Sequence, residues 1–340
     1  MSAGRSLRTG IAVSALGTLM VAMAACGGAS TASSKAAPSI DKASFTVAFP
    51  GPPDVADIPV LAAIHNLDQM GYNAKVKDFN GGAVATEAVI ANHAQVTAGS
   101  PAALFKADIK GDHLVTFAIK TTNEFALVAQ SKYKTPQDLN GAQLGLASPT
   151  TSTHTLILWS EKKYHFKPDI VYVGSSPVRA QALLAGRLAA TVLELDDVTK
   201  VERASPGKFH DLIDYAKVLP NLFGDVFMTN AAYLKSHPTV LKAFTQQLDS
   251  AYKQAYQHPK TFEKLAPKYI KGYTPAAVAK TMNISVKFHI WGPAASPGLM
   301  TTAAARSTLA FFTKAGEINA AGAKKLANLH WFYGAFTHSG

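Results

Sequence analysis

Short apolar runs alternate with amphipathic segments between Ser44 and Ala118. The runs have the length of strands, and turns with Gly, Pro or Ser separate them from the segments that follow. A strand, a turn and a helix repeated in this order predict an α/β unit with a parallel sheet covered by helices. The strands are expected at Phe45–Phe49, Ala74–Phe79, Gln95–Ala98 and Leu114–Ile119, and the helices at Asp57–Asn66, Val84–Asn92 and Pro101–Lys110.

A second series begins at Thr135, and the pattern changes again after Leu219. Helices are expected at Thr135–Leu139, Ser152–Tyr164 and Pro177–Ala185, and strands at Ala142–Ala147, Ile170–Val173 and Ala189–Leu193. One more strand, Asp225–Thr229, precedes helices at Ala231–Ser236, Pro238–Tyr256, Pro259–Tyr269 and Pro275–Val286, most of which begin at a proline. The restart and the later return predict two lobes, the first formed by residues 43–124 and 220–340 and the second by residues 125–219.

The first 25 residues have the order of an export signal. Arg5 and Arg8 precede the apolar stretch Ile11–Val21, and Ala24 and Ala25 stand before Cys26. This arrangement resembles a bacterial lipoprotein signal, and the resemblance implies that Cys26 is acylated and anchors the protein on the extracytoplasmic face of the cell membrane. The alternative is an ordinary secretory signal cleaved near Ala25. Residues 26–42 are rich in Gly, Ala, Ser and Thr, which predicts a flexible tether.

The composition of the chain limits the number of domains, the possible disulfides and the kinds of partner. The chain has 340 residues, 48% of them hydrophobic, and no second apolar run of membrane length, so about two domains are expected after the signal. Its single cysteine excludes an intramolecular disulfide. The formal charge is +11, and loss of the signal with its two arginines leaves +9. Because the lysines are dispersed and aromatic residues do not alternate with them, we expect no nucleic-acid partner.

Three turns between a strand and a helix are rich in glycine and hydroxyl groups: Asn80-Gly81-Gly82, Gly99-Ser100-Pro101 and Ser148–Thr153. Ligands of open parallel sheets bind at the carboxyl ends of strands, where helix N-termini offer free NH groups. Helix capping alone also explains each turn, as with Ser100 before Pro101. Three such turns in two successive series favour the facing surfaces of a binding cleft.

Four segments carry a resemblance to a known family: Phe79–Ala103, Thr135–Leu146, Arg179–Glu194 and Asp225–Pro238. In order and spacing they resemble the SsuA-like solute-binding proteins of nitrate, sulfonate, taurine and thiamine-precursor ABC importers. The resemblance implies the type II periplasmic-binding-protein fold, with two lobes of mostly parallel sheets flanked by helices. It also implies a hinge of two crossings, near residues 122–130 and 215–222, and a solute held between the lobes.

The same resemblance implies a set of ligand-binding residues, with no catalytic residue, metal or cofactor among them. Thr150–Thr153 and Ser100 are expected to hold an oxyanion, whereas Glu194 either accepts from a cationic group or caps the next helix. Arg179 either reaches an anion or forms a surface salt bridge. The full set is Gly51, Pro52, Gly82, Ser100, Thr121, Thr122, Thr150, Thr151, Ser152, Thr153 and Glu194.

The expected function is therefore solute capture without chemistry. The chain has no Gly-x-Ser-x-Gly, Gly-x-Gly-x-x-Gly or His-Glu-x-x-His motif, and its histidines are scattered, so an enzyme is not expected. The expected partners are a small solute and the permease and ATPase subunits of an ABC importer, with the receptor itself a monomer. The alternative is an envelope sensor that signals to a membrane partner without transport.

Overall fold

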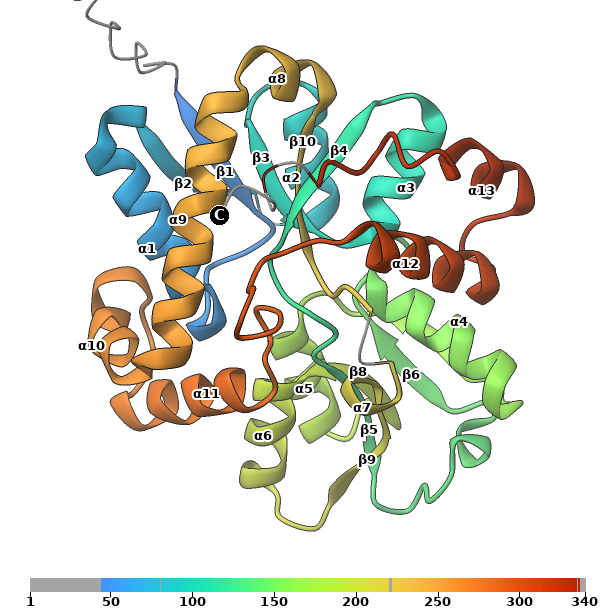
Figure 1. Cartoon of the computed structure of the whole chain (residues 1–340). Helices are drawn as coiled ribbons and strands as arrows, with labels where there is room; N and C mark the ends of the chain where they lie inside the picture. Colours follow the sequence, from blue (N-terminus) through green and yellow to red (C-terminus); the bar gives the residue numbers. More distant parts are fainter. Residues whose placement is uncertain (1–43, 80, 220–221, 335, 337–340) are drawn as a thin grey trace, which may run out of the picture. The chain divides into compact units, whose positions relative to one another are not determined.

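A computed structural model describes residues 44–79, 81–219, 222–334 and 336. These residues form two five-stranded sheets, each flanked by helices (Figure 1). The first sheet has the order β2-β1-β3-β10-β4, in which β10 runs antiparallel to its neighbours β3 and β4. Its strands are β1 (Phe45–Phe49), β2 (Ala74–Asp78), β3 (Val96–Gly99), β4 (Leu114–Ile119) and β10 (Val226–Asn230).

The second sheet has the order β7-β6-β8-β5-β9, in which β5 runs antiparallel to β8 and β9. Its strands are β5 (Phe125–Gln130), β6 (Gln143–Leu146), β7 (Asp169–Tyr172), β8 (Ala190–Glu194) and β9 (Phe209–Asp214). The sequence analysis expected neither β5 nor β9 as a strand. Each sheet thus contains parallel strands and one strand that runs antiparallel to both of its neighbours. That strand is β10 in the first sheet and β5 in the second.

Helices around the first sheet include the longest of the described chain, α9 (Pro238–Gln257), which packs on α1 (Ile58–Leu67). Here the rings of Phe45, Phe117 and Phe227 each pack on Phe244 of α9, with centroids 5.3 to 6.3 Å apart. The other helical segments that belong to residues before 120 or after 225 are η1 (Val55–Asp57), η2 (Asp68–Tyr72), α2 (Gly82–Ile90), α3 (Pro101–Lys110), α8 (Ala231–Ser236), α10 (Pro259–Tyr269), α11 (Pro275–Lys287), α12 (Thr302–Ala315) and α13 (Ala320–Leu326).

The second sheet is accompanied by η3 (Pro136–Leu139), α4 (Ser152–Tyr164), α5 (Ser176–Leu184), α6 (Leu195–Ala204) and α7 (Tyr215–Val218). On one face, Ala126, Val128 and Leu193 of the strands pack with residues of α5 and α6. On the other face, apolar residues of the sheet and of α4 belong to a cluster that also contains residues of α3 and α12. Because this cluster draws residues from both sheets, burial of apolar side chains holds the two halves of the described chain together.

The α/β fold expected from sequence is confirmed. Phe45–Phe49 and Gln143–Leu146 lie in different sheets, as two lobes require. Within the described residues, no helix has both the length and the apolar character needed to cross a bilayer. The predicted signal, the tether and Cys26 lie outside the described residues, and so do parts of the predicted lobe boundaries.

Candidate functional site

Two backbone segments connect the sheets, and they run beside each other. The first follows β4 and leads into β5, whereas the second follows α7 and leads into β10. Thr122 and Phe223 form an antiparallel bridge, and the NH of Asn123 donates to Leu222 O at 3.1 Å. The Asn123 side chain donates to Tyr215 O at 2.7 Å and to Leu219 O at 3.1 Å. The two crossings are therefore hydrogen-bonded to each other. Next to them lie polar residues that follow β1, precede β5 and end β8.

Aspartates of the turn after β1 form the first group at this junction. Asp54 is the N-cap of η1, where its Oδ1 accepts from the NH of Ala56 at 2.8 Å. Asp57 is buried and pairs with the ammonium group of Lys120, which follows β4, at 2.8 Å. Among the residues that the structure describes, no ammonium or guanidinium group forms an ion pair with Asp54. Burial is the main reason that the pKa of Asp54 is raised to about 7, and the nearby Asp57 and Asp196 carboxylates add to the increase.

The second group comes from β5 and β8, which are neighbours in the second sheet. Glu124 precedes β5 and Glu194 ends β8, and the NH of Leu195 donates to Glu124 O at 2.9 Å. Both side chains are partly exposed, and neither has a hydrogen-bond or ion-pair partner among the described residues. Burial raises the pKa of Glu124 well above its usual value, with Glu194 the next contribution. The pKa of Glu194 is raised in the same way, by burial and then by Asp54 and Asp196.

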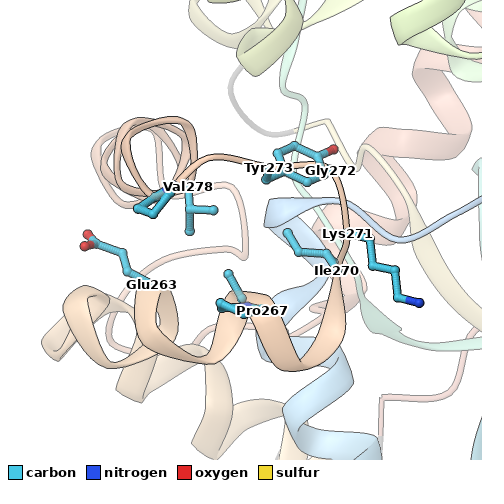
Figure 2. A pocket seen from close by; sticks show the side chains of 9 residues that line it. Glu263, Pro267, Ile270, Lys271, Gly272, Tyr273 and Val278 are labelled. Atoms are coloured by element: carbon cyan, nitrogen blue, oxygen red, sulfur yellow. The ribbon is translucent and has the colours of Figure 1, made fainter.

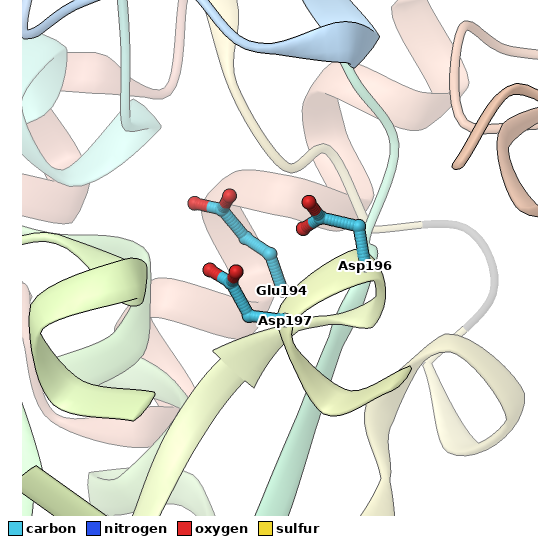
Figure 3. Close-up of side chains that lie close together, drawn as sticks. All are labelled: Glu194, Asp196 and Asp197. Carbon is cyan, nitrogen blue, oxygen red and sulfur yellow. The ribbon is translucent and has the colours of Figure 1, made fainter. Parts of the chain in front are cut away.

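The third group lies at the start of α6. Figure 3 shows that the carboxylates of Glu194, Asp196 and Asp197 lie close together, and one oxygen from each falls within 4.8 Å of the others. The Lys200 ammonium donates to Asp196 and to Asp197, at 2.7 Å in each case. Burial and Asp197 raise the pKa of Asp196, while Lys200 opposes the increase. Unlike Glu194, the two aspartates of this group already have a cationic partner within the chain.

These groups define one feature, the carboxylate cluster, which we take as Asp54, Glu124, Glu194 and Asp196. Its members come from three separate parts of the sequence, next to strands of both sheets, and their charges affect one another's pKa. An arrangement of acceptors with few bonded cations is suited to a ligand that carries a positive charge or several hydrogen-bond donors. The sequence analysis selected only Glu194 from this cluster.

Arg179 lies in the interior of the second sheet's half of the chain, and its hydrogen bonds go to backbone carbonyls. It is 1% exposed, and its Nε donates to Val192 O at 3.0 Å while Nη1 donates to Gly174 O. Burial lowers the pKa of Arg179 to about 10, and the Glu194 and Asp197 carboxylates oppose that decrease. The expectation of a surface salt bridge is therefore wrong. Arg179 instead joins two backbone segments, the turn before α5 through Gly174 O and the strand β8, which ends at Glu194, through Val192 O.

The hydroxyl groups expected to bind an oxyanion are bonded mainly to one another. Ser100 caps α3 through the NH of Ala102, and its Oγ lies 2.8 Å from Oγ of Ser152, the first residue of α4. Thr151 Oγ1 donates to Ser148 O at 2.8 Å and lies 2.9 Å from Thr153 Oγ1. Thr150 Oγ1 lies 3.3 Å from the Ser148 hydroxyl. The two turns are thus brought together, but their hydroxyls already have partners in the chain.

The remaining sequence-predicted residues lie at turns near the crossings or before helices. Thr121 is buried, and its Oγ1 accepts from the NH of Asp225 at 3.2 Å. The Thr122 hydroxyl donates to His289 O at 3.3 Å. Gly51 and Pro52 lie in the turn before η1, and Gly82 is the first residue of α2. Among the described residues, no hydrogen bond or ion pair joins the side chains of these residues to the carboxylate cluster. Gly51 and Pro52 belong to the turn that positions Asp54.

Sequence reasoning also missed a glycine in the second crossing. A Cβ added at Gly224 would collide with the carbonyl oxygen of Thr122 and with its carbonyl carbon, and would stand 2.8 Å from the Thr121 hydroxyl. The NH of Gly224 donates to Thr121 O at 3.0 Å. Only a residue without a side chain allows the two crossings to approach this closely.

Two pockets on the described surface lie apart from the predicted residues. One, of about 320 Å³, lies between α10 and α11 and is lined by Ile270, Tyr273 and Val278, with Glu263 and Lys271 at its margin (Figure 2). The other, of about 360 Å³, is lined by Trp159, Lys162, Lys163 and Lys314. Tyr273 connects the first pocket with the junction, because the Lys200 ammonium lies 5.8 Å from the centre of its ring.

Solved structures place this architecture in a known class, the type II periplasmic-binding-protein fold. The alkanesulfonate-binding protein SsuA from Xanthomonas axonopodis pv. citri, bound to MOPS, is similar over 86% of this chain and 98% of its own, with a TM-score of 0.68 at 17% identity. The nitrate-binding protein NrtA from Synechocystis PCC 6803 is similar over 86% of both chains, with a TM-score of 0.69 at 8% identity. A zinc-bound ligand-binding component of an ABC-type import system from Staphylococcus aureus reaches 0.65 at 15% identity, over 81% of this chain and 92% of its own.

Residues 68–262 match the family described as NMT1/THI5 like, and the chain therefore belongs to that family. No curated protein is significantly similar to it in sequence. The structural similarities have low identities and establish the fold. The expected SsuA-like family and the expected fold are both confirmed.

Proposed function

We propose that this chain is a lipid-anchored extracytoplasmic solute-binding protein of an ABC importer, which captures a small solute between two lobes and passes it to a permease. The observation that carries the proposal is the junction itself. Two sheets joined by a pair of hydrogen-bonded crossings bring polar groups from both halves of the chain to one place. Proteins of this fold that bind alkanesulfonates and nitrate support the role.

The two lobes would comprise residues 43–124 with 220–340, and residues 125–219. The lobes would separate by bending at the two crossings, because the chain passes from one sheet to the other only between β4 and β5 and between β9 and β10 within the described residues. Asn123, which bonds the second crossing through its side chain, would keep the crossings together during this motion. The chain would do no chemistry, and its partners would be the solute, the permease and the ATPase.

The candidate solutes are sulfonates, taurine, nitrate and pyrimidine precursors of thiamine. A thermal-shift screen of the purified protein over these classes, extended to small amines, tests the proposal. A ligand at 100 times its dissociation constant stabilises the folded protein by about 2.7 kcal/mol. Stabilisation by one class supports a solute receptor, whereas an unchanged melting temperature with every class contradicts it.

Uptake by cells separates import from sensing. Deletion of the gene should abolish uptake of the solute identified in the screen, and expression of the intact chain should restore it. Retained uptake in the deletion strain, together with a lost transcriptional response to that solute, would instead support an envelope sensor.

A further inference from the structure

A buried carboxylate, that of Glu317, is bonded to both halves of the described chain. Glu317 follows α12, and its side chain is only 2% exposed. One oxygen pairs with the ammonium group of Lys106 on α3, whereas the other accepts from Nδ1 of His154 at 3.1 Å and from Thr155 Oγ1 at 3.3 Å. Lys106 lies with α12 in the proposed first lobe, and His154 and Thr155 lie on α4 of the second. We call these four residues the interlobe clasp.

Lys106 makes a further contact between the two lobes. Its ammonium group also donates to Pro149 O, in the turn before α4, at 2.8 Å. Further along α4, the ring of Trp159 packs on that of Phe311 of α12, with centroids 6.1 Å apart. The helix α4 thus lies next to both α3 and α12 (Figure 1), and the clasp is a polar part of that contact.

The donors of the second lobe are held in position within that lobe. Because a carboxylate oxygen only accepts hydrogen bonds, Nδ1 of His154 is the donor of its bond to Glu317, whatever the state of the second ring nitrogen. The ring of His154 packs edge-on against Tyr172, the last residue of β7, with centroids 6.1 Å apart. Thr155 is fully buried on α4. The second lobe therefore presents two oriented donors to a carboxylate of the first.

Glu317 depends on these bonds because it has almost no access to water. Burial of a carboxylate by itself raises its pKa, but hydrogen bonds from His154 and Lys106 outweigh burial and place the pKa of Glu317 below its usual value. The group is therefore ionised at neutral pH, and an ionised group in the interior requires its donors. Movement of α4 away from α3 and α12 would break its bonds to His154 and Thr155.

A second contact between the lobes has a different character. There α11 lies next to α6, and Ile284 and Phe288 pack on the apolar cluster that contains Val198 of α6. The Lys200 ammonium lies 5.8 Å from the ring centre of Tyr273. Among the described residues, no hydrogen bond or ion pair joins α11 to α5 or α6. The hydrogen bonds between helices of the two lobes thus lie on the side of α4.

We propose that the interlobe clasp is a lock that favours the closed arrangement of the two lobes and so sets how readily the receptor opens for its solute. This inference rests on the proposed function, since it assumes that the lobes separate. The bonds of the clasp exist only while α4 touches α3 and α12, so their loss raises the share of open molecules. A solute that binds the closed form then binds more weakly, in proportion to the closed share that is lost. Glu317 is thus a positioning residue, which acts on the solute through the lobes.

Spin-label distances in the ligand-free protein test the lock without knowledge of the solute. Labels at Val84→Cys of α2 and Val178→Cys of α5 report on the two lobes, because both valines are exposed, and Cys26→Ala removes the only other cysteine. We expect Glu317→Gln and Lys106→Met each to lower the share of molecules with the shortest distance at least about threefold, because each removes a charged hydrogen bond of the closed form. A cooperative melting transition shows that each variant is folded.

A matched control separates the lock from a general loss of buried charge. Glu161 also lies on α4 with a mostly buried side chain, 12% exposed, but it pairs with Lys167 of the same lobe at 2.9 Å. Glu161→Gln should therefore leave the distances unchanged. Distances that are the same in the wild type and in both clasp variants would overturn the proposal, and so would an equal change in Glu161→Gln. If Glu317→Gln does not fold, Thr155→Val removes one donor of the clasp at nearly constant size and gives the same test.

Solute affinity separates this inference from the proposed function. With a solute that stabilises the protein in the thermal-shift screen, Glu317→Gln should weaken the affinity measured by calorimetric titration at least about threefold. Unchanged affinity would overturn the lock and leave the proposed function intact. A shift of the distances in Glu317→Gln when no solute of the screen binds would support the lock and contradict the proposed function.

Discussion

The hydroxyl oxygens of Ser100 and Ser152 lie 2.8 Å apart, although the two residues begin helices that belong to different sheets. Ser100 is 7% exposed and Ser152 is 4% exposed, so this hydrogen bond is shielded from water. It joins the starts of α3 and α4 directly. One of the two hydroxyls donates to the other, so that donor is not available to a ligand while the bond is present.

Removal of this hydrogen bond should lower the stability of the ligand-free protein. Ser152→Ala should cost about 0.5 to 1.5 kcal/mol in the free energy of unfolding. Ser100→Ala should cost more, by about 1 kcal/mol, because Ser100 also caps α3. Urea unfolding of the single and double variants gives the coupling between the two sites. Strictly additive losses would mean that the two hydroxyls do not stabilise each other.

The raised pKa of Asp54 predicts a specific dependence of stability on pH. Because the pKa is raised from 3.8 to about 7, the folded protein holds a proton that the unfolded chain has released between these values. This contribution is fully present below pH 3.8 and is lost as the pH rises through about 7. Asp54→Asn, which keeps an oxygen to cap η1, should therefore be more stable than the wild type at pH 8, with a difference that shrinks towards pH 4.

Chemical denaturation of both proteins across this pH range measures the difference. Asp249→Asn is the control, because Asp249 forms an exposed pair with Lys253 on α9. Its free energy of unfolding should differ from that of the wild type by no more than about 0.5 kcal/mol at every pH. A constant difference between Asp54→Asn and the wild type at all pH values would show that the Asp54 carboxylate does not titrate as described.

A side chain at residue 224 should disturb the crossings. In Gly224→Ala the new Cβ meets the Thr122 carbonyl, so we expect a loss of about 1 to 3 kcal/mol in stability and weaker solute binding. Gly51→Ala provides a comparison for stability alone, since a Cβ there has nothing within 4 Å. Thermal melting of the two variants, and calorimetric titration of Gly224→Ala against the wild type, give the result. An equal loss of stability in Gly224→Ala and Gly51→Ala would mean that the close approach of the crossings does not exclude a side chain at residue 224.

Cys26 is the residue that the predicted anchor requires. Cys26→Ala should prevent acylation, and the protein should then be released or remain as unprocessed precursor. Palmitate labelling and fractionation of cells that express either form test this. Equal incorporation of label by the wild type and the variant would refute a lipid anchor at Cys26.

Much of the fold can be predicted from the sequence, because the residues that mark most strands and helices lie within those elements. Phe45–Phe49 is apolar except for Thr46, and proline at the starts of α9 and α11 marks those helices before any tertiary contact is known. β9 gives a weak strand signal, because its sequence Phe-His-Asp-Leu-Ile-Asp has neither a continuous apolar run nor strict alternation of polar and apolar residues. β5 was missed because Phe125–Gln130 was assigned to a crossing.

The site was less predictable than the fold, because it is formed by residues that are far apart in the sequence and come together only in the folded chain. Glu194 was found from its place at the end of a strand. Asp54 has a similar signal, because it lies shortly after β1. The sequence analysis names Gly51 and Pro52 of the same turn as ligand-binding residues and does not name Asp54. Glu124 gives no local signal, since its position at the start of β5 required that strand to be recognised. The engagement of Ser100 with Ser152 could not be foreseen, because each residue alone has the pattern of an ordinary helix cap.

The central claim is that a solute binds between two lobes and holds them together. The distance between spin labels in a Cys26→Ala background, which has no other cysteine, tests it most directly. Labels at Val84→Cys of α2 and Val178→Cys of α5 are suitable, because both valines are exposed, at 49% and 47%. The account predicts a broad distribution of distances without solute and a single shorter distance when a solute that stabilises the protein in the thermal-shift screen is saturating. An identical distribution in the presence of that bound solute would contradict it.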